Sequence, residues 1–172
     1  MGATAGRTMF HLTRRDRLDA IMRDGLVPGP RLFSTDYAGD NEHIVEAEAM
    51  AYGRRPVYLS AEPWFSPDDY DLLLEYGDPA DFVLLAVDTA GLELLADAPR
   101  LVEQMDAHRE GALIVRDGPT PLDRWFADGR LPLAALRDEA LALAAMALTG
   151  TCATLSPIPP GRVVAAAPPR RR

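Results

Sequence analysis

The stretch Phe82-Val83-Leu84-Leu85-Ala86-Val87-Asp88 contains six consecutive apolar residues. A run of this kind is typical of a strand covered on both faces, because a strand with one face in water alternates apolar and polar residues. We therefore predict that residues 82–88 form a central strand of a β-sheet. The rest of the chain is expected to be arranged around this strand.

Upstream of this strand, the sequence predicts two further strands and a helix. Thr8-Met9-Phe10-His11-Leu12-Thr13 is an apolar stretch interrupted by one histidine, which indicates a buried strand. The helix is expected to follow, with Asp16 as its cap and Asp24-Gly25 as its end. Pro56-Val57-Tyr58-Leu59-Ser60 predicts the third strand, which is entered through a proline.

Weaker patterns predict the remaining elements. They are strands at 31–35, 112–115 and 124–127, helices at 41–52, from 67 to 74 or 76, and at 132–148, and a short helical connection at 89–96. After Gly150 the composition shifts to Ser, Pro, Gly, Ala and Arg, most clearly from about residue 157. We therefore expect one domain at 1–150 and a flexible Pro/Ala/Arg-rich tail at 151–172.

The composition is that of an ordinary soluble globular domain. The chain has 172 residues, of which 48% are hydrophobic and 26% charged, and its mean hydropathy is −0.09. Cys152 is the single cysteine, which excludes a disulfide framework within the chain and favours a reducing compartment. No apolar run reaches about 18 residues and no signal peptide is recognised, so we expect a cytoplasmic protein without a membrane partner.

The charged residues exclude some kinds of chemistry. All 18 basic residues are arginine, so no lysine is present to act as a Schiff base or general base. The formal net charge is −8, and an acidic surface repels a phosphate backbone at long range. Broad nonspecific DNA binding is therefore disfavoured, whereas a local basic cleft remains compatible with the sequence.

Several common functional motifs are absent from the sequence. The chain contains no G-x-G-x-x-G or G-x-x-x-x-G-K-[ST] loop for nucleotides and no G-x-S-x-G elbow for a hydrolase. His43 and Glu46 fall on one helical face, but no second pair has metal-ligand spacing, so we expect no metal site. Cys152 is interpreted as incidental rather than as a nucleophile.

Short sequence motifs, called words below, follow one another in this chain in an order that resembles the ADP-ribosyltransferase fold family, and within it the RNA 2'-phosphotransferases and small bacterial ADP-ribosyltransferases. The words are Phe10-His11-Leu12-Thr13, Met22-Arg23-Asp24-Gly25-Leu26-Val27-Pro28, Val57-Tyr58-Leu59-Ser60, Phe82 to Asp88, and Arg124-Trp125-Phe126 running into Gly129-Arg130-Leu131-Pro132-Leu133. The resemblance spans roughly residues 9–136. It implies an α+β, ADP-ribosyltransferase-like fold of two small, packed, mostly antiparallel β-sheets with flanking helices.

The resemblance also implies a substrate and the residues that bind it. NAD would be held so that its bond to nicotinamide breaks with oxocarbenium character. His11 would hydrogen-bond the adenosine-side ribose, and Thr13 would assist it. Tyr58 would stack on the nicotinamide ring, with Phe33 as the rival aromatic residue. Arg14 and Arg15 would contact phosphate because they follow the His-x-Thr word directly.

The catalytic carboxylate is where this sequence departs from the family pattern. In the family the carboxylate sits just before or on the strand that precedes an "Ile-Pro" or "Val-Pro" word. With that word placed at 129–133, the candidates are Asp123, beside Arg124, and Glu110 further upstream, and neither is a clean match. The phosphotransferases lack this carboxylate and grip a 2'-phosphate with arginines. Arg54 and Arg55 are further arginines available for that role.

The function implied by the resemblance is NAD-dependent transfer of ADP-ribose to a protein or nucleic-acid acceptor. One alternative is a catalytically silent member of the same fold that binds a nucleotide or a partner. The other is an NAD-dependent RNA 2'-phosphotransferase. NAD is expected as a substrate without a metal, whereas the sequence does not identify the acceptor or the oligomeric state.

Overall fold

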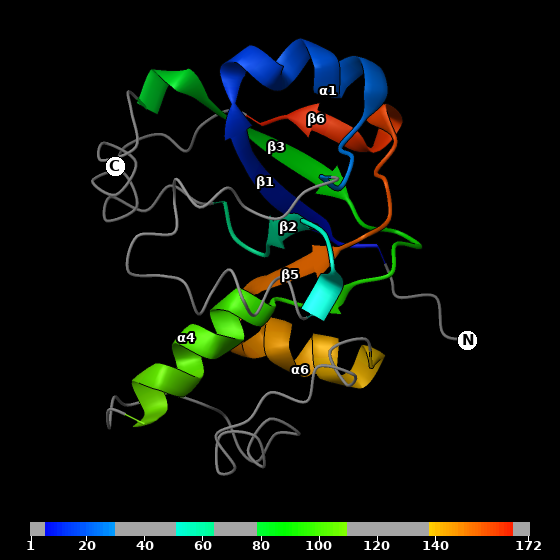
Figure 1. Cartoon of the computed structure of the whole chain (residues 1–172). Helices are drawn as coiled ribbons and strands as arrows, with labels where there is room; N and C mark the ends of the chain where they lie inside the picture. The colour runs from blue at the N-terminus through cyan, green and yellow to red at the C-terminus, as the bar shows by residue number, and fades with distance from the viewer. Residues whose placement is uncertain (1–5, 30–50, 64–78, 110–137, 167–172) are drawn as a thin grey trace. The chain divides into compact units, whose positions relative to one another are not determined.

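The computed structural model describes residues 6–29, 51–63, 79–109 and 138–166, and all structural statements refer to these ranges (Figure 1). In chain order the elements are β1 (Thr8–Arg14), η1 (Arg15–Arg17), α1 (Leu18–Asp24), β2 (Val57–Ser60), η3 (Pro79–Asp81), β3 (Phe82–Asp88), β4 (Leu95–Ala96), α4 (Ala98–Arg109), α6 (Glu139–Thr149), β5 (Thr151–Thr154), η5 (Pro160–Arg162) and β6 (Val163–Ala165). The protein is therefore of the mixed α/β kind.

The strands form one open six-stranded sheet in the order β4-β5-β2-β1-β3-β6. The pairs β1–β2, β1–β3, β3–β6 and β4–β5 are antiparallel. The expectation of a mostly antiparallel sheet with helices is confirmed. The described strands do not divide into two separate sheets as expected, because β2 hydrogen-bonds to β1 on one side and to β5 on the other.

The prediction of a strand at residues 82–88 that is covered on both faces is confirmed, although β3 is an interior strand beside the edge strand β6 rather than the centre of the sheet. β3 lies between β1 and β6, and its register with β1 runs from Thr8–Asp88 to Arg14–Phe82. Val83, Leu84, Leu85 and Val87 are all buried. Since neighbouring residues of a strand face opposite sides of the sheet, β3 is covered on both faces.

The chain divides into two compact units. The first unit comprises residues 1–27, 59–92 and 156–172, and the second comprises residues 28–58 and 93–155. β1, α1, β3 and β6 belong to the first unit, and β4, β5, α4 and α6 to the second. The boundary passes through β2, between Tyr58 and Leu59.

In the first unit, α1 ends at Gly25 as predicted. Gly25 has φ 85° and ψ −176°, a conformation that glycine adopts readily and other residues rarely do, and its N–H donates to Ile21 O at 2.7 Å. A Cβ atom at Gly25 would lie 2.1 Å from Ile158 O. The close approach of these distant segments therefore leaves room only for glycine at the helix end, and α1 lies next to η5 (Figure 1).

The start of α1 differs from the expectation. Asp16 lies in η1, one residue before the helix N-cap Arg17, and α1 has no side-chain cap hydrogen bond. A single turn of 3-10 helix leads into α1 instead, and the N–H of Leu18 donates to Arg15 O. The prediction that Asp16 caps the helix is therefore wrong, although the helix itself is present.

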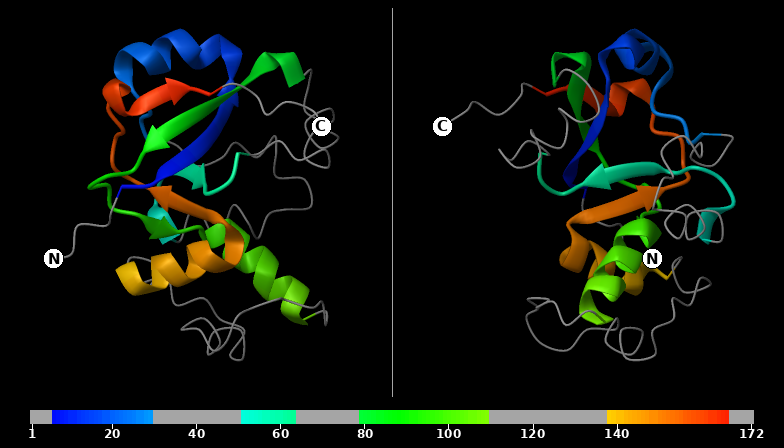
Figure 2. Two further views of the ribbon diagram at one scale, coloured as in Figure 1. Left: turned by 180° about the vertical axis from the view of Figure 1, so that it is seen from behind. Right: turned by 60° about the vertical axis from the view of Figure 1, so that its left-hand side comes forward.

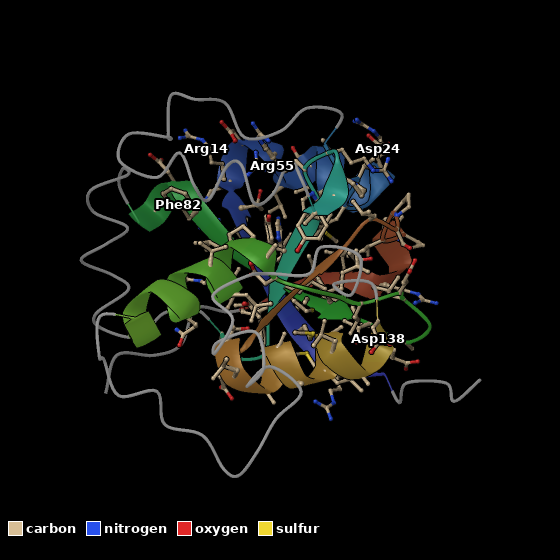
Figure 3. All side chains as sticks on the ribbon, turned by 60° about the horizontal axis from the view of Figure 1, so that its bottom comes forward. Arg14, Asp24, Arg55, Phe82 and Asp138 are labelled. Atoms are coloured by element: carbon tan, nitrogen blue, oxygen red, sulfur yellow. The ribbon has the colours of Figure 1, made fainter. Side chains whose placement is uncertain are left out.

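The second unit has its own apolar core between helices and strands. α6 packs against β4 and β5, and α4 packs against α6 (Figure 2). The buried members of this core are Ala51, Tyr52, Leu95, Ala96, Ala98, Leu101, Leu141, Ala145 and Ala153. Asp138 caps α6 by accepting from Leu141 N at 3.0 Å, and the left-handed Gly150 ends the helix (Figure 3). The predicted helix at 132–148 is thus confirmed over 139–148, and its first residues lie outside the described ranges.

Two expectations about connecting segments are wrong. The expected helical connection at 89–96 contains strand β4 instead, whose Leu95 and Ala96 pair with Ala153 and Cys152. The expected tail contains β5, η5 and β6, and Val163 of β6 pairs with Val87 of β3. Pro, Gly and Ser disfavour regular structure locally, but pairing with a distant strand and burial outweigh that preference.

Other predicted elements lie outside the described residues. They are the strands at 31–35, 112–115 and 124–127, the helix at 67–76, and the helix at 41–52 except for its last two residues. Helix α4 was not anticipated from the sequence. Within the described residues, no helix has the length and apolar character needed to cross a membrane.

Candidate functional site

His11 and Thr13 lie on the same face of β1. Both side chains are half-buried, and their cross-strand partners Leu85 and Val83 of β3 are buried. Residues two apart on a strand share a face, so the His-x-Thr spacing presents an imidazole and a hydroxyl together. β1 is flanked by β2 and β3, which holds its backbone on both edges.

Arg14 lies on the opposite face of β1. It pairs with Phe82 at the end of the β1–β3 ladder (Figure 3). Its Nε atom lies 3.3 Å from Asp16 Oδ2, and the two side chains are 52% and 65% exposed. An ion pair this exposed contributes little to stability because water screens it. The strand geometry therefore separates Arg14 from the face that carries His11 and Thr13.

Arg15 is engaged by the main chain. Its Nε donates to Ala80 O at 2.8 Å, and its Nη2 donates to Phe82 O at 3.0 Å. These bonds tie η1 to the start of β3. Two of the five guanidinium N–H donors are therefore used in a structural contact.

The second unit contains Tyr58 and two further candidate arginines, Arg54 and Arg55. Tyr58 is half-buried and packs against the apolar core of that unit, between the buried residues Val57 and Leu59 along β2. Arg54 Nη2 donates to Leu155 O at 2.9 Å, which fixes the end of β5. Arg55 is exposed. Tyr58 thus has the packing of an aromatic residue at the margin of a core.

The structure brings four of the predicted site residues into one unit: His11, Thr13, Arg14 and Arg15 all lie in the first. Tyr58 lies in the second unit. The two candidate carboxylates, Asp123 and Glu110, and the rival aromatic Phe33 lie outside the described residues.

An "Ile-Pro" word is present at Ile158-Pro159, in the part of the chain that was expected to be a tail, whereas residues 131 and 132 read Leu-Pro. The strand that precedes it is β5, Thr151–Thr154, whose residues are all buried. None of the four residues of β5 is a carboxylate. The β-branched threonines after Gly150 were the signal in the sequence that indicates this strand.

Cys152 lies in the interior of the second unit. Burial, followed by the negative charge of nearby Asp97, raises the pKa of its thiol to about 12. Asp97 is itself buried and accepts a hydrogen bond from Arg100 N at 3.1 Å at the start of α4. A thiol that stays protonated and inaccessible is a poor nucleophile, in agreement with the interpretation of Cys152 as incidental.

Within the described ranges, no group of three or more His, Cys, Asp or Glu side chains is arranged to hold a metal ion. His43 and Glu46 lie outside those ranges. Comparisons with protein-family models, with curated proteins and with solved structures each found no match to this chain. The residues and their geometry are therefore the basis on which a function can be assigned.

Proposed function

We propose that this protein transfers ADP-ribose from NAD to a protein or nucleic-acid acceptor. The observation that supports the proposal best is the shared face of His11 and Thr13 on β1, a strand held by neighbours on both edges. Half-buried polar side chains on such a strand are fixed in direction and remain accessible in part. That combination suits hydrogen bonding to ribose hydroxyls.

In this proposal each residue has a limited role. His11 binds the adenosine-side ribose of NAD, and Thr13 supports that contact. Tyr58, a residue of the second unit, keeps the role that the resemblance implies, stacking on the nicotinamide ring, as a separate prediction. The bond between nicotinamide and ribose breaks with the electron pair leaving on nicotinamide, and the acceptor nucleophile forms a new bond to the same ribose carbon. A carboxylate assists this step, with Asp123 or Glu110 proposed for the role.

A catalytically silent binding protein of the same fold is the second candidate. The absence of a carboxylate from β5, the strand before Ile158-Pro159, favours it. RNA 2'-phosphotransfer is a third candidate and depends on arginines that grip phosphate. Because Arg15 and Arg54 already donate to main-chain carbonyls, that candidate has less support from these two residues.

Nicotinamide release separates the three candidates. Purified protein is incubated with NAD alone, with protein, RNA or DNA acceptors, and with RNA carrying a 2'-phosphate. ADP-ribosyl transfer requires release together with label on an unphosphorylated acceptor. Calorimetric NAD binding without turnover supports the silent candidate, and activity confined to 2'-phosphorylated RNA supports the third. Neither binding nor turnover under any condition contradicts all three.

A further inference from the structure

We infer that Ser60 is a positioning residue for His11, and this inference rests on the proposed function only in that His11 is taken to bind the ligand. Ser60 is the last residue of β2 and only 6% exposed. Its Cα pairs with that of Phe10 on β1, the residue directly before His11. All three residues belong to the first unit.

The Ser60 hydroxyl has two main-chain partners. Its single proton is shared between two carbonyl oxygens: Oγ donates to Glu62 O at 2.7 Å and, in a longer and weaker contact, to Phe10 O at 3.4 Å. The shorter bond, to a carbonyl two residues along the chain, fixes the position of the hydroxyl. The longer contact then reaches the carbonyl of the Phe10–His11 peptide. Since a peptide unit is planar, restraining this carbonyl also restrains the N–H of His11 and the direction in which its side chain leaves the strand.

Ser60 supports β1 on its β2 edge, where its Cα pairs with that of Phe10, while the register of β1 with β3 continues from Thr8 to Arg14. On the β2 edge, Ser60 therefore lies beside the peptide that leads into His11. Binding groups need to be held to within about 0.5 Å, so a small displacement here weakens ligand binding more than it destabilises the fold.

Thr89 provides a matched control for a merely structural role. It is 3% exposed and its hydroxyl also bonds to the main chain next to β1, donating to Arg7 O at 2.9 Å and accepting from Arg7 N at 3.2 Å. This contact lies at the start of β1, away from His11. Ser60→Ala and Thr89→Val therefore each remove a buried hydroxyl that holds this segment, and only the first does so beside His11.

The test compares full-length wild-type protein with these two variants. Three quantities are measured: the melting temperature, the NAD dissociation constant by calorimetry well below the transition, and the ligand-free imidazole resonances of His11 by NMR. We expect both variants to melt about 2–4 °C earlier. Ser60→Ala should also weaken NAD binding about 3- to 10-fold and move the His11 resonances. Thr89→Val should leave binding and resonances unchanged.

Ser60→Thr keeps the hydroxyl and should restore both the NAD affinity and the His11 resonances. The inference is overturned if Ser60→Ala and Thr89→Val give the same His11 resonances as the wild type. It is also overturned if Ser60→Thr behaves as Ser60→Ala does. If the wild-type protein binds no NAD while Ser60→Ala alone moves the His11 resonances, the proposed function fails and the positioning of His11 by Ser60 stands.

Discussion

Leu26 and Ile158 exchange two main-chain hydrogen bonds, from Leu26 N to Ile158 O at 2.9 Å and from Ile158 N to Leu26 O at 2.8 Å. This isolated bridge joins the Gly-Leu-x-Pro word after α1 to the Ile-Pro word before β6. Both side chains are buried. The two words therefore form one structural contact in the first unit, although the sequence separates them by most of the chain.

This contact predicts that Gly25→Ala is strongly destabilising. Alanine at this position would adopt an unfavourable backbone conformation, and its Cβ would overlap Ile158 O. We expect a loss of more than about 3 kcal/mol in the free energy of unfolding, measured by urea denaturation. Gly150→Ala is the control, because Gly150 is left-handed at φ 70° but a Cβ atom there would have no neighbouring atom within 4 Å. It should lose only about 1–2 kcal/mol, and equal losses in the two variants would contradict the role assigned to the Ile158 contact.

Ile158→Ala tests whether residues 156–166 are part of the folded domain. Ile158 is 1% exposed, so its truncation leaves a cavity and should cost about 2–5 kcal/mol. Val164→Ala in β6 is the matched control, because Val164 is 63% exposed and its truncation should change stability by less than about 0.5 kcal/mol. Both values come from chemical denaturation. An Ile158→Ala protein as stable as Val164→Ala would mean that this segment does not contribute to the core.

Tyr52→Phe should destabilise the second unit without altering its apolar volume greatly. The buried Tyr52 hydroxyl donates to Ala96 O and accepts from Ala98 N at 2.8 Å, so it connects β4 to the start of α4. Phenylalanine would leave both main-chain groups without this partner, and we expect a loss of about 2 kcal/mol or more. Thermal and urea unfolding provide the measurement. Wild-type stability in this variant would show that the bridge is energetically unimportant.

Cys152 should make the protein lose stability at alkaline pH. The pKa of its thiol is raised from 9.0 to about 12 in the folded chain, so the folded state binds the proton more tightly than the unfolded state. The stabilisation is fully present below about pH 9 and is lost as the pH rises towards 12, by up to about 1.4 kcal/mol per pH unit.

The measurement for Cys152 is urea unfolding of wild type and Cys152→Ala between about pH 8 and about pH 10.5, a range that begins below the thiol pKa of the unfolded chain. The variant should be less stable at the lower end because it lacks a buried side chain, but its stability should fall less steeply with pH. At the lower end of this pH range, Cys152 in the folded protein should also react slowly with a thiol reagent. Parallel pH profiles for the two proteins would be inconsistent with the raised pKa.

His11→Ala separates the ligand-binding role of His11 from a purely structural one. If His11 binds the NAD ribose, the variant should lose about 10-fold or more in NAD affinity, because a binding partner is left without its hydrogen bond. Its melting temperature should remain close to that of the wild type. Thr8→Ala, an exposed position at the start of β1, is the control and should bind NAD normally. A His11→Ala protein that melts several degrees earlier yet binds NAD as the wild type does would remove His11 from the site.

The sequence alone was sufficient where the pattern of apolar residues is local and unambiguous. The run at 82–88 predicted β3 and its burial on both faces, and the stretch at 8–13 predicted β1. The His-x-Thr spacing was enough to place His11 and Thr13 on one face, because side chains alternate along any strand. The position of Gly25 at the end of α1 followed from the conformational freedom of glycine.

Only the tertiary structure decided the elements that depend on distant partners. Leu95–Ala96 is a strand because it pairs with Cys152 and Ala153, and Val163–Ala165 is a strand because it pairs with β3. Likewise, the main-chain carbonyls that engage Arg15 lie at Ala80 and Phe82, far along the chain. Short segments have little preference of their own, since a strand is stabilised by hydrogen bonds and packing that its neighbours in space supply.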